Sequence, residues 1–215
     1  MPEGEQTFGA PCLPIVNSAL TLVGTRLLST ATDTSKEAVL IRTNWDTYRR
    51  AMLRLGIWKF AKENVTLQPD ADFTAPFGLA NRYPLPADFI RLVMFNNHAA
   101  NTDADPVWQT MNGYIYTNMS YANLTYIADV TDVTQFDPLF CEALSAYIYQ
   151  KLCKTLTGTD GDPKVLKTSI QEARFAGSVE DPAPQLDIDI WLQSRFGGPS
   201  LFRDPPFAQG CALFP

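Results

Sequence analysis

The sequence predicts an α+β protein, mainly α, in which an antiparallel helical bundle carries an inserted small antiparallel β-sheet and an extended C-terminal arm. Three observations support this class: a well-capped apolar helix in residues 136–158, an Asn112-Gly113 hairpin in the middle of the chain, and a proline-rich end at residues 181–215. Predicted helices flank the β-rich middle instead of alternating with its strands, which favours α+β over α/β.

The helix in residues 136–158 has signals at both ends. Asp137 can cap its free N–H groups, Pro138 suits the first helical position, and Gly158 can supply a left-handed end. Apolar residues recur between them at helical spacing over a wide stripe. This width predicts that the helix lies at the centre of the bundle.

Two helices are expected before the β-rich region. The first runs from Pro14 to Val23 and is stopped by Gly24. The second begins at a Thr34-Ser35-Lys36-Glu37 capping box and ends at Gly56. A seam at steps of three and four favours antiparallel packing of the second helix; it comprises Ala38, Ile41, Trp45, Tyr48, Met52 and Leu55. The arginines off this seam are expected to form a solvated face, with an intersubunit or phosphate-facing role as the alternative: Arg42, Arg49, Arg50 and Arg54.

The middle of the chain has β signals. Alternation predicts extended chain over residues 57–67, and residues 89–95 form either a helical turn or a strand. The Asn112-Gly113 pair predicts a type I′ hairpin within residues 107–117, and residues 121–130 supply another strand, with Leu124, Tyr126 and Ala128 on one face. Loops are expected at residues 68–81 and 96–106.

Asp162-Pro163 starts a last helix, which is expected to reach about Glu180. The chain therefore divides into five parts: a leader (1–13), N-terminal helices of the bundle (14–56), an inserted β-rich region (57–135), C-terminal helices of the bundle (136–180) and the arm (181–215).

The arm combines prolines with many large apolar residues. Proline opposes compact regular structure, yet the segment is too apolar for an ordinary disordered tail. Such a segment is expected to lie against its own domain or another subunit, one route being addition of a strand to a neighbour's sheet edge. The candidate partner-binding residues are Ile188, Ile190, Trp191, Leu192, Phe196, Leu201, Phe202, Phe207 and Phe214.

Composition limits the classes of function. The net charge of −6 argues against a dedicated surface for DNA or acidic membranes. No run of eighteen apolar residues occurs, so no membrane span is expected, and residues 1–13 do not resemble a secretory signal. The four cysteines are expected to be buried, reduced thiols.

Catalytic and cofactor motifs are not found. His98 is the only histidine and falls in a predicted polar loop, so neither a histidine-based metal site nor a histidine-dependent triad is expected. The pairs Asp103/Asp105 and Asp187/Asp189 lack the rest of a calcium loop. We expect no cofactor and no enzyme activity, although paired carboxylates that meet only in the folded chain leave a hydrolase as an alternative. Sheet packing is favoured over base stacking for Tyr114, Tyr116, Tyr121 and Tyr126.

Three stretches, in this order, carry a family likeness. The first joins Arg49-Arg50 to Gly56-Ile57-Trp58-Lys59-Phe60 and continues to Leu67-Gln68-Pro69. The second comprises Tyr83-Pro84-Leu85-Pro86-Ala87-Asp88-Phe89 and the hairpin Gly113-Tyr114-Ile115-Tyr116. The third runs from Tyr126-Ile127-Ala128-Asp129-Val130 into Phe136-Asp137-Pro138-Leu139-Phe140. Together they resemble the tail tubular protein A family, the head-to-tail adaptors of short-tailed bacteriophages, over about residues 13–180.

The resemblance implies a structural virion protein with no catalytic residue. Members form a ring of twelve copies beneath the dodecameric portal protein and above the tail nozzle protein, where they seal the head and continue the DNA channel. Some also hold tail fibres. The implied location is the head–tail joint of the virion, assembled in the host cytoplasm, with double-stranded DNA passing through without specific binding. Another phage tail-joint or tail-completion protein is the alternative.

Overall fold

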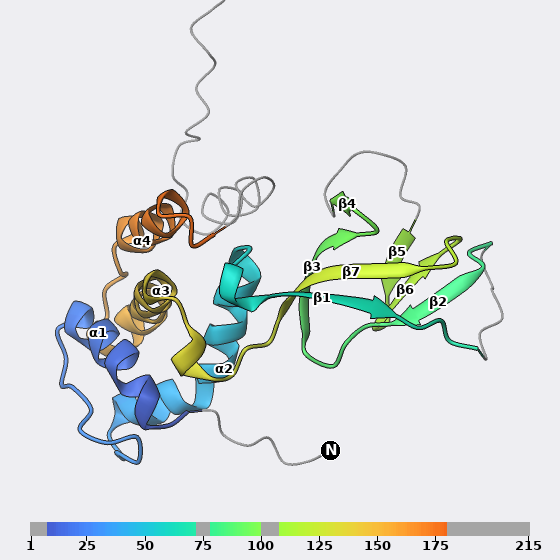
Figure 1. Ribbon diagram of the computed structural model, residues 1–215. Helices are drawn as coiled ribbons and strands as arrows, with labels where there is room; N and C mark the ends of the chain where they lie inside the picture. The colour runs from blue at the N-terminus through green and yellow to red at the C-terminus, as the bar shows by residue number, and fades with distance from the viewer. Residues whose placement is uncertain (1–7, 72–77, 100–107, 180–215) are drawn as a thin grey trace, which may run out of the picture.

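The described chain combines four α-helices, gathered in one part of the molecule, with strands that extend away from them (Figure 1). The computed structural model describes residues 8–71, 78–99 and 108–179, which form a mixed α/β structure. The helices are α1 (Leu13–Val23), α2 (Lys36–Leu55), α3 (Pro138–Thr157) and α4 (Pro163–Phe175). Short 3₁₀ turns lie at η1 (Ala10–Cys12), η2 (Lys59–Ala61) and η3 (Val133–Gln135).

The predicted central helix, α3, has the caps that its sequence indicates. The carboxylate of Asp137 accepts a hydrogen bond from the Leu139 N–H at 2.8 Å, and Gly158 adopts a φ of 78°. Helix α3 packs against α1, α2 and α4. It therefore supplies much of the larger core, including the fully buried Phe140 and Leu144.

Helix α2 begins one residue later than its predicted capping box requires. Ser35, and not Thr34, is the N-cap, and its Oγ accepts from the Ala38 N–H at 3.4 Å. The carboxylate of Asp33 accepts from the Ser35 N–H at 2.8 Å, which fixes the backbone just before the helix. The hydrogen bond from Ser35 to Asp33 thus favours Ser35 over the adjacent Thr34 as the N-cap.

The β-rich region contains two antiparallel sheets, so the prediction of one sheet is wrong. One sheet has the order β1 (Lys62–Leu67), β7 (Ala122–Ala128), β3 (Phe89–Phe95) and β4 (His98–Ala99). The other has the order β2 (Asn81–Pro84), β6 (Tyr114–Thr117) and β5 (Trp108–Met111). Side chains of both enclose a second core, which includes Leu124 and Tyr126 from β7, Phe95 from β3 and Tyr83 and Ile115 from the smaller sheet. The strands belong to two sheets because β2 pairs with β6 and not with β3.

Two turns with positive φ values determine where the predicted strands and loops of the β-rich region are found. Asn112 and Gly113 have φ values of 52° and 78°, as the predicted type I′ hairpin requires. Asn96 and Asn97 also have positive φ values, of 47° and 67°, and join β3 to the two-residue strand β4 inside a predicted loop. Residues 89–95 form a strand, which resolves the alternative left open by the sequence.

The last described residues leave α4 sooner than predicted. Helix α4 ends at Phe175 instead of near Glu180, and Gly177 turns the chain with a φ of 75°. Val179 then forms an isolated antiparallel bridge with Trp58. After the helix ends, the chain thus pairs through its backbone with the segment before η2.

Two further expectations concern the cysteines and membrane-spanning segments. Cys12, Cys141 and Cys153 are free thiols. Cys12 and Cys153 are buried as expected, whereas Cys141 is half-buried, and Cys211 lies outside the described residues. Among the described residues, none of the helices combines the length and apolar character needed to cross a membrane.

Candidate interaction site

The nine candidate partner-binding residues, Ile188 to Phe214, all lie outside the described residues. The aspartate pairs Asp103/Asp105 and Asp187/Asp189 lie there too. The described surfaces that could meet a partner therefore belong to the body to which the arm is attached.

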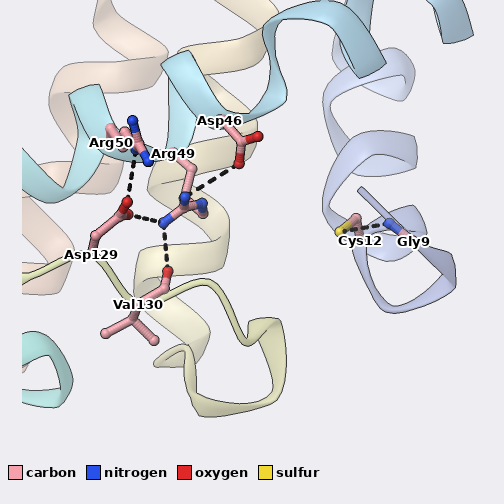
Figure 2. A network of polar contacts seen from close by, with 7 residues as sticks. All are labelled: Gly9, Cys12, Asp46, Arg49, Arg50, Asp129 and Val130. Atoms are coloured by element: carbon pink, nitrogen blue, oxygen red, sulfur yellow. Dashed lines mark hydrogen bonds and ion pairs between the residues drawn. The ribbon is translucent and has the colours of Figure 1, made fainter. Parts of the chain in front are cut away.

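A buried polar joint connects α2 to the end of β7 (Figure 2). Arg49, whose side chain is 1% exposed, forms an ion pair with Asp129 and donates from Nη1 to the Val130 carbonyl at 2.7 Å. Its Nη2 donates to Asp46 at 3.2 Å, and Arg50 Nε donates to the second carboxylate oxygen of Asp129 at 2.7 Å. One carboxylate thus receives two neighbouring arginines of the same helix.

A second contact extends the joint along α2. Arg54 Nη1 donates to the Ile90 carbonyl at 2.8 Å, and Arg91 Nη1 donates to the Arg54 carbonyl at 3.1 Å. Ile127 of β7 is buried in the helical core, which adds apolar contact between the two parts. The helices and the β7 sheet are therefore held in one orientation by charge-assisted hydrogen bonds and by packing.

The joint corrects the prediction that four arginines form a solvated face. Arg49 is buried, and the half-buried Arg42 donates to the carbonyls of Ala31 and Asp33 at 2.7 and 2.8 Å. Only Arg50 and Arg54 are exposed, and both are bonded across the joint. The sequence did contain a signal for Arg49, because it lies four residues after Trp45 and three before Met52, on the buried face.

The first exposed apolar feature lies at the end of α4. Phe175 is 97% exposed, and a groove of about 400 Å³ lies beside it. The groove is lined by Leu139, Thr168, Gln171, Glu172, Phe175 and Ala176. After α4 the chain remains close to the start of α3, since Ser178 Oγ donates to the Asp137 carboxylate at 3.0 Å. An uncovered apolar surface thus adjoins the start of the arm.

The second exposed feature is the outer face of the β2-β6-β5 sheet. The rings of Tyr114 and Tyr116 are 6.4 Å apart between centroids, and the Arg82 guanidinium lies 4.4 Å from the Tyr114 ring centre. Hydrogen bonding to Asp70 raises the pKa of Arg82. Met111, opposite Tyr114 in the register, is 45% exposed. Tyrosine, arginine and methionine are the residue types enriched in the cores of protein interfaces.

A phenol lies between two carboxylates in the described part of the β-rich region. The Tyr126 hydroxyl lies 3.1 Å from both Glu63 Oε2 and Asp88 Oδ1, and burial together with these carboxylates raises the pKa of Tyr126. Tyr126 links β1 and the start of β3 to β7, so this carboxylate pair is occupied by a structural hydrogen bond. Within residues 8–71, 78–99 and 108–179, no three metal-ligating side chains come together.

No family model matches this chain, and no curated protein matches its sequence. The likeness to phage adaptors accordingly depends on the order of the motifs in the sequence. Those motifs occupy the joint and the cores: Arg49-Arg50 and Asp129 form the ion pairs, and Trp58 and Phe140 stack edge to face with ring centroids 4.8 Å apart.

Proposed function

We propose that this protein is a structural virion protein, a head-to-tail adaptor that forms a ring of twelve copies between the portal and the tail nozzle of a short-tailed bacteriophage. The motif order of residues 13–180 supports the proposal, together with a body whose parts are fixed to one another through Arg49 and Asp129. In this role the ring seals the head after packaging and continues the DNA channel.

The observation that carries the proposal is the presence of two unlike apolar surfaces at opposite ends of the body. Contacts between neighbours in a ring are heterologous, so each copy has to present two different, complementary surfaces. The end of α4, with Phe175, lies among the helices, whereas the face with Tyr114 and Met111 lies on the distant β2-β6-β5 sheet (Figure 1). Two separate, unlike surfaces fit heterologous contacts, which form a ring when the rotation between neighbours closes.

Within this proposal, α1 to α4 act as an antiparallel helical bundle, the two sheets are an insertion between α2 and α3, and residues 181–215 form an extended arm. The bundle gives the ring its rigid wall. The arm supplies contacts to the portal, the nozzle or a neighbouring copy, through its nine large apolar residues from Ile188 to Phe214. Tail fibres are a further partner of the ring in this proposal.

Charge supports passage of DNA without capture. The chain carries 17 basic and 23 acidic residues, and affinity for the phosphate backbone increases with the number of basic contacts. A ring built from such a chain lets the duplex move through. The proposal places the protein at the head–tail joint of the virion after assembly in the host cytoplasm, with no cofactor.

The test is binding to the portal protein encoded in the same genome. We expect the full-length chain to co-sediment with portal rings, Phe202→Asp to weaken this binding at least tenfold, and Ser200→Asp, two residues away in the arm, to bind as the natural chain does. A natural chain that fails to bind portal but binds an assembled tail nozzle would favour a different tail-joint component. Equal binding by both variants would remove Phe202 from the interface.

A further inference from the structure

We propose that, in the free protein, the groove beside Phe175 holds a segment of the same chain, residues 191–196. The proposal assigns an occupant to this surface independently of any portal or ring. In the free protein it leaves the later part of the arm, from Leu201 to Phe214, for a first contact with a partner. The ring contacts proposed for Phe175 and for the earlier arm residues form once residues 191–196 leave the groove.

The groove has the properties of a surface to which another segment binds. Leu139, Phe175 and Ala176 make its base apolar, while Thr168, Gln171 and Glu172 supply a polar edge. Phe175 is 97% exposed, and burial of an exposed phenylalanine ring removes apolar surface from water, which is favourable. Burial of apolar surface would therefore stabilise a contact with this groove.

The position of the last described residues makes the groove reachable. Ser178 is bonded to Asp137, two residues before Leu139 of the groove, and Val179 is fixed by its bridge to Trp58. Trp191 follows Val179 by twelve residues, which can span up to about 40 Å. Helix α4, with 13 residues, is only about 20 Å long. A tether of this length gives an effective concentration of about millimolar for contact within one chain.

Charge selects the segment among those that can reach. Glu172 gives the groove an acidic edge. Asp187 and Asp189 would bring like charge to it, and so would Asp204 beside Arg203. The segment Trp191-Leu192-Gln193-Ser194-Arg195-Phe196 combines two aromatic rings with a cation and contains no acidic residue. Trp191 and Phe196 fit the apolar base, and Arg195 pairs with Glu172. A groove of about 400 Å³ accommodates few large side chains, so the later apolar residues of the arm remain outside it.

Disulfide trapping in the full-length chain tests the contact. In a Cys211→Ser background, Thr168→Cys combined with Ser194→Cys is expected to form an intrachain disulfide at least tenfold faster than Thr43→Cys combined with Ser194→Cys. Thr43 is the matched control, because it is an exposed threonine on α2 and not part of the groove. Equal rates would overturn the proposal. A bond that forms only between chains would also overturn it and assign the groove to a second copy.

Limited trypsin digestion gives a second measurement without new cysteines. Phe175→Asp is expected to accelerate cleavage after Arg195 about tenfold and to leave cleavage after Arg203 unchanged. Val39→Asp, at another exposed apolar position that lies on α2, should change neither rate. Unchanged cleavage after Arg195 in Phe175→Asp would contradict the proposal. Both assays lack portal, so their failure is distinct from a failure of the adaptor proposal.

Discussion

Removal of the Asp129 carboxylate tests how the helices and the sheets are joined. Arg49 is 1% exposed, and in Asp129→Ala it would keep only the Val130 carbonyl and the partly exposed Asp46 as partners. Breaking a buried ion pair by removing one partner costs about 3–5 kcal/mol. The remaining partners favour the lower end, so we expect the free energy of unfolding to fall by about 3 kcal/mol.

Arg50→Ala is the matched control, because it removes the other ion pair of the same carboxylate. The Arg50 side chain is 59% exposed, and exposed ion pairs contribute about 0–1 kcal/mol. Urea unfolding measures both variants by circular dichroism. With a slope of about 2 kcal/mol per M, the midpoint should fall by about 1.5 M in Asp129→Ala and by less than about 0.5 M in Arg50→Ala.

A compensating variant separates the ion pair from general damage at this position. Adding Arg49→Met to Asp129→Ala removes the unpaired buried cation, so at least half of the lost stability should return. Equal midpoints for Asp129→Ala and Arg50→Ala would refute the argument that burial of Arg49 decides the energetics. A double variant less stable than Asp129→Ala alone would refute it as well.

Three further predictions follow from local geometry. Asp137→Ala should lower the free energy of unfolding by about 1–2 kcal/mol in urea titration, because the carboxylate caps α3. Gly113→Ala should lower it by about 1 kcal/mol, because Gly113 has a φ of 78°, whereas Ala at Gly9, which has a negative φ, should have a smaller effect. Burial raises the pKa of Cys141 to about 11, so at pH 8 its thiolate fraction is about a hundredfold below that of an ordinary thiol. Its alkylation, followed by mass spectrometry, should be at least about tenfold slower than that of an exposed cysteine, since the higher nucleophilicity offsets only part of this loss; an equal rate would contradict the burial.

The elements that the sequence predicted well are those specified by neighbouring residues. Asp137-Pro138 and Gly158 determine the two ends of α3, each acting only on the few residues beside it. Asn112-Gly113 determines the β5–β6 hairpin in the same local way. In each case the backbone conformation is fixed locally, by a side chain that caps free N–H groups or by a pair of residues that tolerates positive φ.

The features that sequence reasoning missed depend on residues far apart in the chain. Arg49 is buried because Asp129 and Val130, some eighty residues later, supply its partners. Helix α4 ends at Phe175, where Gly177 turns the chain with a positive φ and Val179 pairs with the distant Trp58. The division into two sheets depends on β2 pairing with β6 across a long stretch of chain. Spacing along the sequence does not indicate such partners.

The candidate site was predictable only in part. The sequence indicated that the arm needs a surface to lie on, but Phe175 was placed inside a longer helix and so its exposure was not foreseen. Exposure depends on where α4 ends and on what covers its last turn. The groove beside Phe175 was identified from the structure, and the interface-type face of the β2-β6-β5 sheet emerged only when the strand register was known.

Electron microscopy of the full-length chain mixed with portal rings tests the adaptor account most directly. We expect one ring of twelve copies on the tail-facing side of the portal, with density for residues 201–214 crossing from each copy onto a second polypeptide. A chain that remains single beside portal rings, with residues 201–214 packed entirely on its own body, would contradict the account.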